Sequence, residues 1–184
     1  MVRIEFTRRF SMAHRLLADP ASKCATPHGH NEIVRVELRA RARPDLGGSN
    51  MVAPFERLKS RWHHFIDHSV DHALQLRLDD PLVEFFARHE PQRLSRIMTF
   101  AGDPTTEALA LALHAKLSAF LREDAPDFVV ERVSVEETPT NAVSVHRADI
   151  EAMDVAWQAG VWVDRADDTI NDFGVSTLNL RRRG

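Results

Sequence analysis

The sequence is poor in cysteine and tyrosine. It has one cysteine in 184 residues and no tyrosine at all. A single cysteine cannot form a disulfide within the chain, so the fold must rest on its core, and the composition fits a reducing cytoplasm. No apolar run approaches the ~20 residues of a membrane-spanning helix, and residues 2–14 alternate like a strand instead of resembling a signal peptide. We therefore expect no membrane partner.

The chain also lacks a large net charge of either sign. The formal net charge is -3 and the pI is near 6.4, which gives no electrostatic reason to expect a nucleic-acid partner. Hydrophobic residues make up 43% and charged residues 28%, as is ordinary for a globular protein. The ten histidines are more than the composition suggests and hint at metal or acid–base chemistry.

Hydrophobic periodicity predicts an α+β fold. Alternation indicates four strands, at residues 2–14, 31–43, 128–138 and 142–147. Helical spacing indicates two long helices, at about 56–70 and about 103–123, with a short helix at 81–88 and a short strand at 96–101 between them. The order β-β-α-α-β-β predicts an antiparallel four-stranded sheet with both long helices on one face. We expect one domain over residues 1–150 and an extension over 151–184 that packs partly on it.

A metal site is predicted where the first two strands meet. His28 and His30 are separated by Gly29, and side chains at i and i+2 of a strand share one side. The same parity places them on the apolar face with Val34, and it places His14 on the apolar face of the first strand. If these strands pair, the three imidazoles converge, as in a catalytic zinc site with three protein ligands and one open position. The alternative is three core histidines with ordinary hydrogen bonds.

Two charged residues interrupt the apolar faces. Arg8 either points inward from the first strand or is turned outward by a bulge. Glu137 shares a face with Val133 and Val135, where a carboxylate is destabilising unless it has a partner. Each residue therefore calls for a specific partner in the fold.

Several motifs occur together in one order along the chain. They are Phe10–Leu16, Lys23-Cys24 followed by His28-Gly29-His30-Asn31, Met51-Val52 with Phe55, Val70-Asp71-His72, Pro104–Glu107 and Val135–Pro139. On these residues the chain, over about residues 3–146, resembles the 6-pyruvoyl tetrahydropterin synthase / 6-carboxytetrahydropterin synthase family. The resemblance implies a tunnelling fold whose subunits form trimers that close into a barrel, with two trimers stacked into a hexamer and active sites at subunit interfaces.

The resemblance also implies a reaction and residue roles. The expected enzyme is a zinc-dependent lyase that converts 7,8-dihydroneopterin triphosphate into 6-carboxy-5,6,7,8-tetrahydropterin; 6-pyruvoyl tetrahydropterin synthesis and a non-catalytic pterin- or purine-binding module with structural zinc are the alternatives. The implied roles are zinc binding by His14, His28 and His30, proton transfer by Cys24, Asp71 and His72, and pterin binding by Glu137, Thr105, Thr106 and Glu107.

Each of these roles has a simpler alternative. Cys24 is either the catalytic base, a fourth zinc ligand or an inert thiol. Asp67-His68 repeats the dipeptide Asp71-His72 four residues earlier. Glu137 can pair with an arginine, and residues 105–107 are explained as a helix cap alone. The candidates for binding a triphosphate are Arg8, Arg9, Arg15 and Lys23.

The chain departs from the family pattern at several places. Pro54 stands where the family usually has an aspartate, and Glu32 stands where an aromatic residue is common. The tail beyond about residue 150 is additional. These departures bear on the identity of the substrate more than on the class of reaction.

Overall fold

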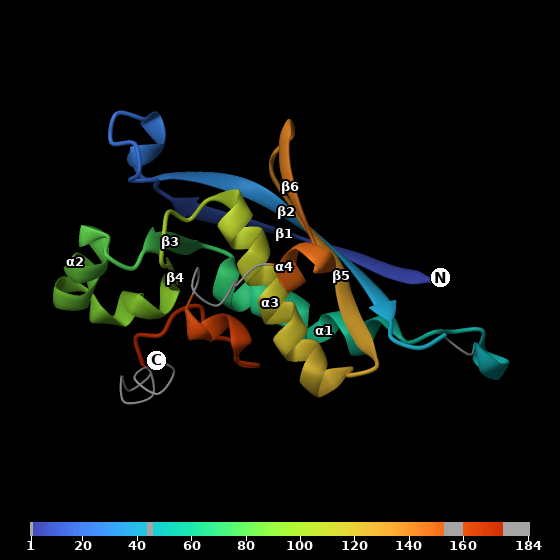
Figure 1. Ribbon diagram of the computed structural model, residues 1–184. Coiled ribbons are helices and arrows are strands. Elements are labelled where there is room, and N and C mark those ends of the chain that lie inside the picture. Colours follow the sequence, from blue (N-terminus) through green and yellow to red (C-terminus); the bar gives the residue numbers. More distant parts are fainter. Residues whose placement is uncertain (1, 44–45, 153–159, 175–184) are drawn as a thin grey trace.

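The computed structural model describes residues 2–43, 46–152 and 160–174. It contains a long sheet with helices packed against one face (Figure 1). The strands are β1 (Arg3–His14), β2 (His28–Ala40), β3 (Ala73–Arg77), β4 (Ile97–Phe100), β5 (Phe128–Thr138) and β6 (Asn141–His146). The helices are α1 (Phe55–Phe65), α2 (Pro81–His89), α3 (Thr106–Asp124) and α4 (Arg147–Ala152).

The sheet has six strands in the order β4-β3-β1-β2-β5-β6. The antiparallel part, β1-β2-β5-β6, is as predicted, but β3 and β4 add a parallel extension next to the end of β1 at residues 12–14. The predicted four-stranded antiparallel sheet is therefore wrong on this side. Ala73-Leu74-Gln75-Leu76 is a short, nearly continuous apolar run, which is typical of parallel strands and carries no alternation for a sequence pattern to reveal.

The core lies between the sheet and the two long helices. Phe65 of α1 and Leu113 of α3 have no exposed surface, and Val34 and Val135 are equally buried beneath them on the sheet. The predicted helix at 56–70 is present, but its last turn, Ile66–Val70, is a π-helix that continues α1. Such wide turns are rare and change the direction in which side chains leave the helix.

The register of β1 and β2 shows whether Arg8 points inward or is turned outward by a bulge. The ladder runs without a break from Arg3 opposite Arg39 to His14 opposite His28, so β1 has no bulge. Arg8 faces the helices and forms a bidentate ion pair with Asp67 in the π turn. The inward orientation is correct, and the charge is satisfied by an aspartate that the helix supplies.

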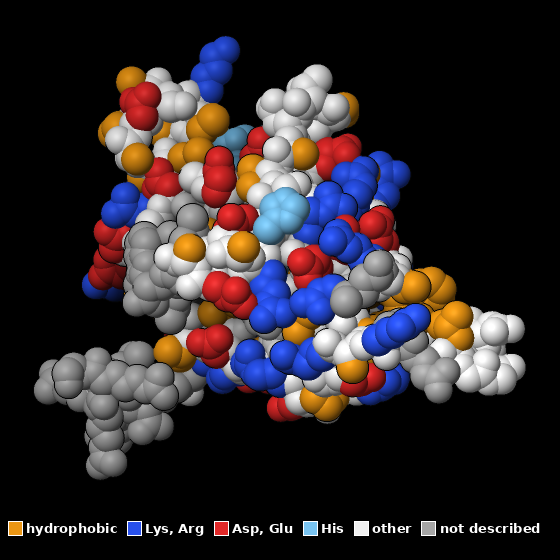
Figure 2. All heavy atoms as spheres, turned by 45° about the vertical axis from the view of Figure 1, so that its right-hand side comes forward, with side chains coloured by type: hydrophobic (Ala, Val, Ile, Leu, Met, Phe, Trp, Pro, Cys, Tyr) orange, Lys and Arg blue, Asp and Glu red, His pale blue; other side chains and the backbone are white. Residues whose placement is uncertain are grey.

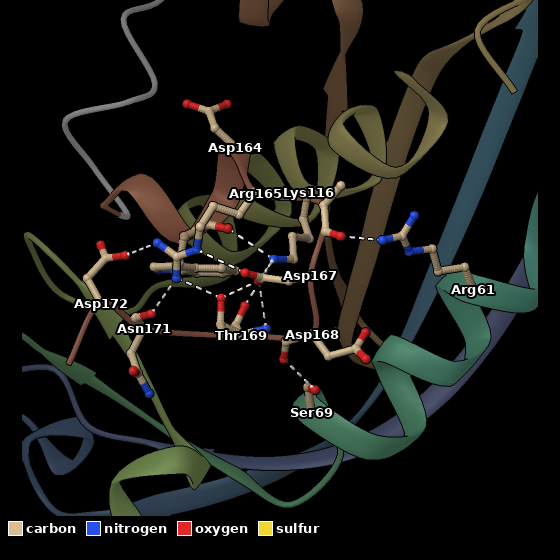
Figure 3. Close-up of polar contacts among 12 residues, drawn as sticks. Arg61, Ser69, Lys116, Asp164, Arg165, Asp167, Asp168, Thr169, Asn171 and Asp172 are labelled. Carbon is tan, nitrogen blue, oxygen red and sulfur yellow. Dashed lines mark hydrogen bonds and ion pairs between the residues drawn. The ribbon is translucent and has the colours of Figure 1, made fainter. Parts of the chain in front are cut away.

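Residues 160–174, which we call the C-terminal strap, pack on α3 and on the outer edge of β4 (Figure 3). Trp162 is fully buried and its Nε1 donates to the carbonyl of Thr99, 3.1 Å away. Lys116 of α3 has no exposed side-chain surface; its Nζ donates to the carbonyls of Trp162 and Thr169 and pairs with Asp167 at 3.2 Å. The rest of the expected extension, residues 153–159 and 175–184, lies outside the described residues.

The outer surface carries both signs of charge. On the face shown in Figure 2, arginine and lysine side chains lie among aspartate and glutamate side chains. Within the described residues, the structure contains no helix with the length and apolar character that crossing a bilayer requires.

Candidate metal centre and substrate pocket

The three predicted ligand histidines come together at the paired ends of β1 and β2. Their ligand nitrogens all lie within 4.8 Å of one another, and the Nε2 atoms of His14 and His28 are 3.1 Å apart. His14 and His28 are direct partners in the β1–β2 ladder, and His30 is two residues further along the same face. His14 is buried, whereas His28 and His30 are partly exposed, so the cluster has one open side.

Backbone carbonyls fix the orientation of two of these rings. His14 Nδ1 lies 2.9 Å from the carbonyl oxygen of Pro104, and His28 Nδ1 lies 2.9 Å from that of Thr26. A carbonyl only accepts, so Nδ1 carries the proton on each ring and Nε2 keeps its lone pair. Burial also lowers the pKa of His14, which favours the neutral imidazole that binds metals. Carbonyl-oriented histidines of this kind are typical of metal sites.

Gly29 holds the two strands at the distance that this arrangement needs. A Cβ atom at residue 29 would lie 2.6 Å from the backbone oxygen of Met12, which is too close for any real side chain. Met12 is the ladder partner of His30, so the close approach occurs within the site itself. The glycine between the histidines is thus required by the packing of β1 against β2.

Cys24 lies close to this end of the strands in a short helical turn, Lys23–Ala25, and is partly exposed. Its carbonyl accepts from the backbone of Leu16, and its own N–H donates to Ser22 Oγ. Among the described residues, the group of metal-ligand atoms consists of the three histidines and does not include the Cys24 thiol. This geometry favours a free thiol over a fourth ligand.

Asp71 and His72 form a carboxylate–imidazole pair at 2.8 Å. Asp71 also accepts from the backbone N–H of Ser11, and His72 has a positive φ of 63° and is well exposed. The competing dipeptide is engaged elsewhere: Asp67 pairs with Arg8, and His68 Nδ1 contacts the carbonyl of His64. Of the two dipeptides only Asp71-His72 makes this pair, and among the described residues no hydrogen bond or ion pair joins it to the three histidines.

Glu137 finds its partner at the start of α3. Thr106 Oγ1 donates to Glu137 Oε1 over 2.7 Å, and no arginine pairs with this carboxylate among the described residues. Thr105 caps the helix by accepting from the N–H of Ala108, and Glu107 is exposed in the first turn. The structure therefore joins Thr106 to Glu137, while Thr105 and Glu107 have the contacts of a helix cap. Pro54, in place of the family aspartate, precedes α1 without any side-chain cap.

The basic candidates for a triphosphate differ in their contacts. Arg15 forms a bidentate ion pair with Asp80, which is buried, and Arg8 is taken by Asp67. Arg9 instead lines a cavity of about 290 Å³ together with Asp71 and His72. Of the four basic residues, Arg9 is thus the one placed beside the proposed relay pair.

One polar residue of this region was missed as a site residue. Glu32 of β2 has no exposed surface, and neither of its carboxylate oxygens has a hydrogen-bond partner in the described structure. Burial, with the nearby Glu137 as the second cause, raises the pKa of Glu32 to about 8. The signal was present in the sequence, because Glu32 has the same parity as His30 and Val34.

These features define a class of protein: an α+β subunit in which paired strands present three convergent imidazoles, with a free thiol nearby. The sequence profile of the 6-pyruvoyl tetrahydropterin synthase family matches residues 3–148, and the chain belongs to this family.

Related sequences and solved structures agree with the family assignment. The chain is 29% identical to 6-carboxy-5,6,7,8-tetrahydropterin synthase of Rickettsia bellii over 77% of its own length and 99% of the relative's. It is 30% identical to a putative 6-pyruvoyl tetrahydrobiopterin synthase of Caenorhabditis elegans, over 77% and 91% of the two chains.

Among solved structures, 6-pyruvoyl tetrahydropterin synthase of C. elegans matches with a TM-score of 0.53 at 29% identity, over 79% of this chain and 94% of the other. The uncharacterized protein WS1659 of Wolinella succinogenes has the same fold, with a TM-score of 0.65 at 22% identity, over 79% and 98% of the two chains.

Proposed function

We propose that this protein is a zinc-dependent lyase that converts 7,8-dihydroneopterin triphosphate into 6-carboxy-5,6,7,8-tetrahydropterin. The observation that carries the proposal is the convergence of His14, His28 and His30 with unprotonated Nε2 atoms on two of the rings. The Rickettsia and C. elegans relatives are named as pterin synthases, which supports a pterin substrate.

The donor set fits zinc. Two unprotonated nitrogens that face each other at 3.1 Å repel unless a cation lies between them. Nitrogens bound to one tetrahedral zinc at about 2.0 Å would be about 3.3 Å apart, close to the observed separation. Bound zinc would lower the pKa of a substrate hydroxyl and stabilise the negative charge that develops on it.

The chain's own residues then have distinct tasks. Cys24 is partly exposed next to the metal site and would remove a proton from the substrate side chain as the thiolate. The Asp71-His72 pair would relay protons, with the carboxylate orienting the imidazole. Because no hydrogen bond or ion pair joins this pair to the three histidines among the described residues, we propose that it serves the site of a neighbouring copy in a trimer or hexamer.

Glu137 would bind the pterin ring. Thr106 occupies Oε1, which holds the carboxylate in place and leaves Oε2 to accept from the amino group and ring nitrogen of the pterin. Residues 1–150 would form this pterin-binding domain.

Incubation of the purified protein with 7,8-dihydroneopterin triphosphate, followed by mass spectrometry of the products, tests the proposal. Acetaldehyde and a 6-carboxy product are expected. Triphosphate release without acetaldehyde would instead indicate 6-pyruvoyl tetrahydropterin synthesis. The absence of any turnover by the zinc-loaded protein would contradict a catalytic role and favour a binding module.

The variant Cys24→Ala separates the base from a fourth ligand. We expect zinc content to stay at the wild-type level while turnover falls at least 100-fold. Loss of zinc together with turnover would show that the thiol closes a structural site. The variant Ser22→Ala, which removes only the hydroxyl that accepts from the Cys24 N–H, is a control in the same turn.

A further inference from the structure

Glu32 is a buried acidic residue whose side chain makes no hydrogen bond within the described part of the subunit. Its exposed fraction is 0%, and both carboxylate oxygens lack a partner in the described structure. Buried polar groups are almost always hydrogen-bonded, because leaving one unpaired in a dry site opposes folding. A leucine would fill this position without that penalty, so the carboxyl group calls for a function outside the packing of the subunit.

The position of Glu32 indicates what that function is. In the β2–β5 ladder Ile33 is opposite Glu136 and Val34 is opposite Val135, so Glu32 comes next to Glu137 on the neighbouring strand. Both acids face the helices, on the side of the sheet that carries His30. Two carboxyl groups therefore lie side by side at the inner end of the candidate site.

The only hydrogen bond to this pair from the described residues is the one that Thr106 donates to Glu137. No arginine or lysine is paired with either acid in that part of the chain. Glu137 is partly exposed, so a ligand can reach Glu137 directly, and it meets Glu32 when the buried carboxyl group of Glu32 turns toward it. The pair thus presents acceptor atoms in excess of the donors that the protein supplies.

We propose that Glu32 is a second substrate-binding carboxyl group, which accepts a hydrogen bond from an N–H or O–H of the pterin that Glu137 does not bind. The inference rests on the proposed function and deepens it, because it makes Glu32 a residue that determines which pterin is accepted. A pterin with an additional donor next to its amino-pyrimidine edge would satisfy both acids at once, whereas a ring without that donor would leave Glu32 unpaired.

The experiment compares ligand binding with stability in the zinc-loaded, full-length protein. Affinity for 7,8-dihydroneopterin is measured by calorimetry, and Tm is measured without ligand. In Glu32→Leu we expect affinity to fall about tenfold or more, because the ligand loses a hydrogen bond to a buried acceptor that no other group replaces. We expect Tm to stay the same or rise by roughly 3 °C, because an unpaired buried carboxyl is gone.

The matched control is Glu136→Gln, on the opposite face of β5, where the carboxylate pairs with Arg35 at 2.7 Å. Its affinity should equal that of the wild type. The conservative variant Glu32→Gln should lose affinity about threefold or more at an unchanged Tm, because an amide keeps only one of the two acceptor atoms.

Wild-type affinity in Glu32→Leu would overturn the inference, whatever the Tm of the variant. If Glu32→Leu does not fold, Glu32→Gln decides: lost affinity at a wild-type Tm supports the inference, and retained affinity overturns it. Failure of the wild-type protein to bind any pterin is a separate result, which would overturn the proposed function and this inference together.

Discussion

The Nε2 atoms of His14 and His28 face each other at 3.1 Å, on rings whose Nδ1 atoms are each bound to a backbone carbonyl. The rings cannot turn away without breaking those two hydrogen bonds. The folded chain therefore aims two lone pairs at one point where a cation can bind both, and metal binding should stabilise the fold.

We expect one zinc ion per chain and a clear effect of its removal. At a free zinc concentration 100 times the Kd, binding adds about 2.7 kcal/mol to the free energy of unfolding, or roughly 5–10 °C in Tm for a chain of this size. Metal analysis and thermal unfolding with and without a chelator measure both quantities. Replacing His28 by alanine should abolish the response, and equal melting curves with and without chelator would count against the site.

Gly29→Ala tests the contact that positions the two histidines. The new Cβ would meet the Met12 backbone oxygen at 2.6 Å, and a backbone atom cannot swing aside. We expect a loss of about 1–3 kcal/mol in stability and a weaker affinity for zinc, because β1 and β2 must separate. Gly102→Ala is the control, since a Cβ there meets nothing within 4 Å. Wild-type zinc affinity in Gly29→Ala would show that the spacing is not critical.

Lys116→Ala should destabilise the protein by about 2–3 kcal/mol. The substitution leaves the carbonyls of Trp162 and Thr169 and the carboxylate of Asp167 without their shared donor (Figure 3). Denaturant unfolding measures the change in free energy. The exposed i,i+4 pair of Arg88 with Glu84 provides the comparison, because Arg88→Ala should change stability by less than about 0.5 kcal/mol. Similar values for the two variants would argue that the strap contributes little.

Because His114 is buried, we expect the folded protein to lose stability in mild acid. Burial lowers the pKa of His114 to about 4 in the folded state, against about 6.5 when unfolded. Between these values the unfolded chain binds more protons, so stability is fully present above pH 6.5 and falls by about 3 kcal/mol as the pH drops to 4. The charged groups around it are Arg147 and Asp149, with Arg41, Arg122 and Glu151 lining the same cavity.

The variant His114→Leu isolates this contribution. Its free energy of unfolding, measured against pH, should exceed that of the wild type by an amount that grows between pH 6.5 and 4. Curves that stay parallel over this range would mean that His114 titrates alike in both states.

The sequence predicted the half of the fold in which alternation is regular. Strand parity alone placed His14, His28 and His30 together, because β1 and β2 pair without a bulge. The parallel strands β3 and β4 could not be found this way, since five- and four-residue apolar strands have no usable periodicity.

Two further features depended on contacts between distant segments. The partner of Glu137 proved to be Thr106, 31 residues away, a pairing that requires the position of α3 over the sheet. The burial of Lys116 depends on Trp162 and Asp167 in the strap, where no pattern in the sequence indicates structure. Glu32, in contrast, was missed, although the parity count that singled out Glu137 applies to it equally.

The C-terminal strap also determines at which edge a strand from another molecule can pair with this sheet. The N–H of Thr99 is bonded to the Ile170 carbonyl, while Trp162 and Asn171 occupy the carbonyls of Thr99 and Ile97. A strand arriving from another molecule would find no free amide or carbonyl at these positions of β4. New pairing is thereby directed to the opposite edge, at β6, and to the first half of β1, which extends beyond β3 on the same side as β4. A short edge that would invite aggregation is closed from within the same chain.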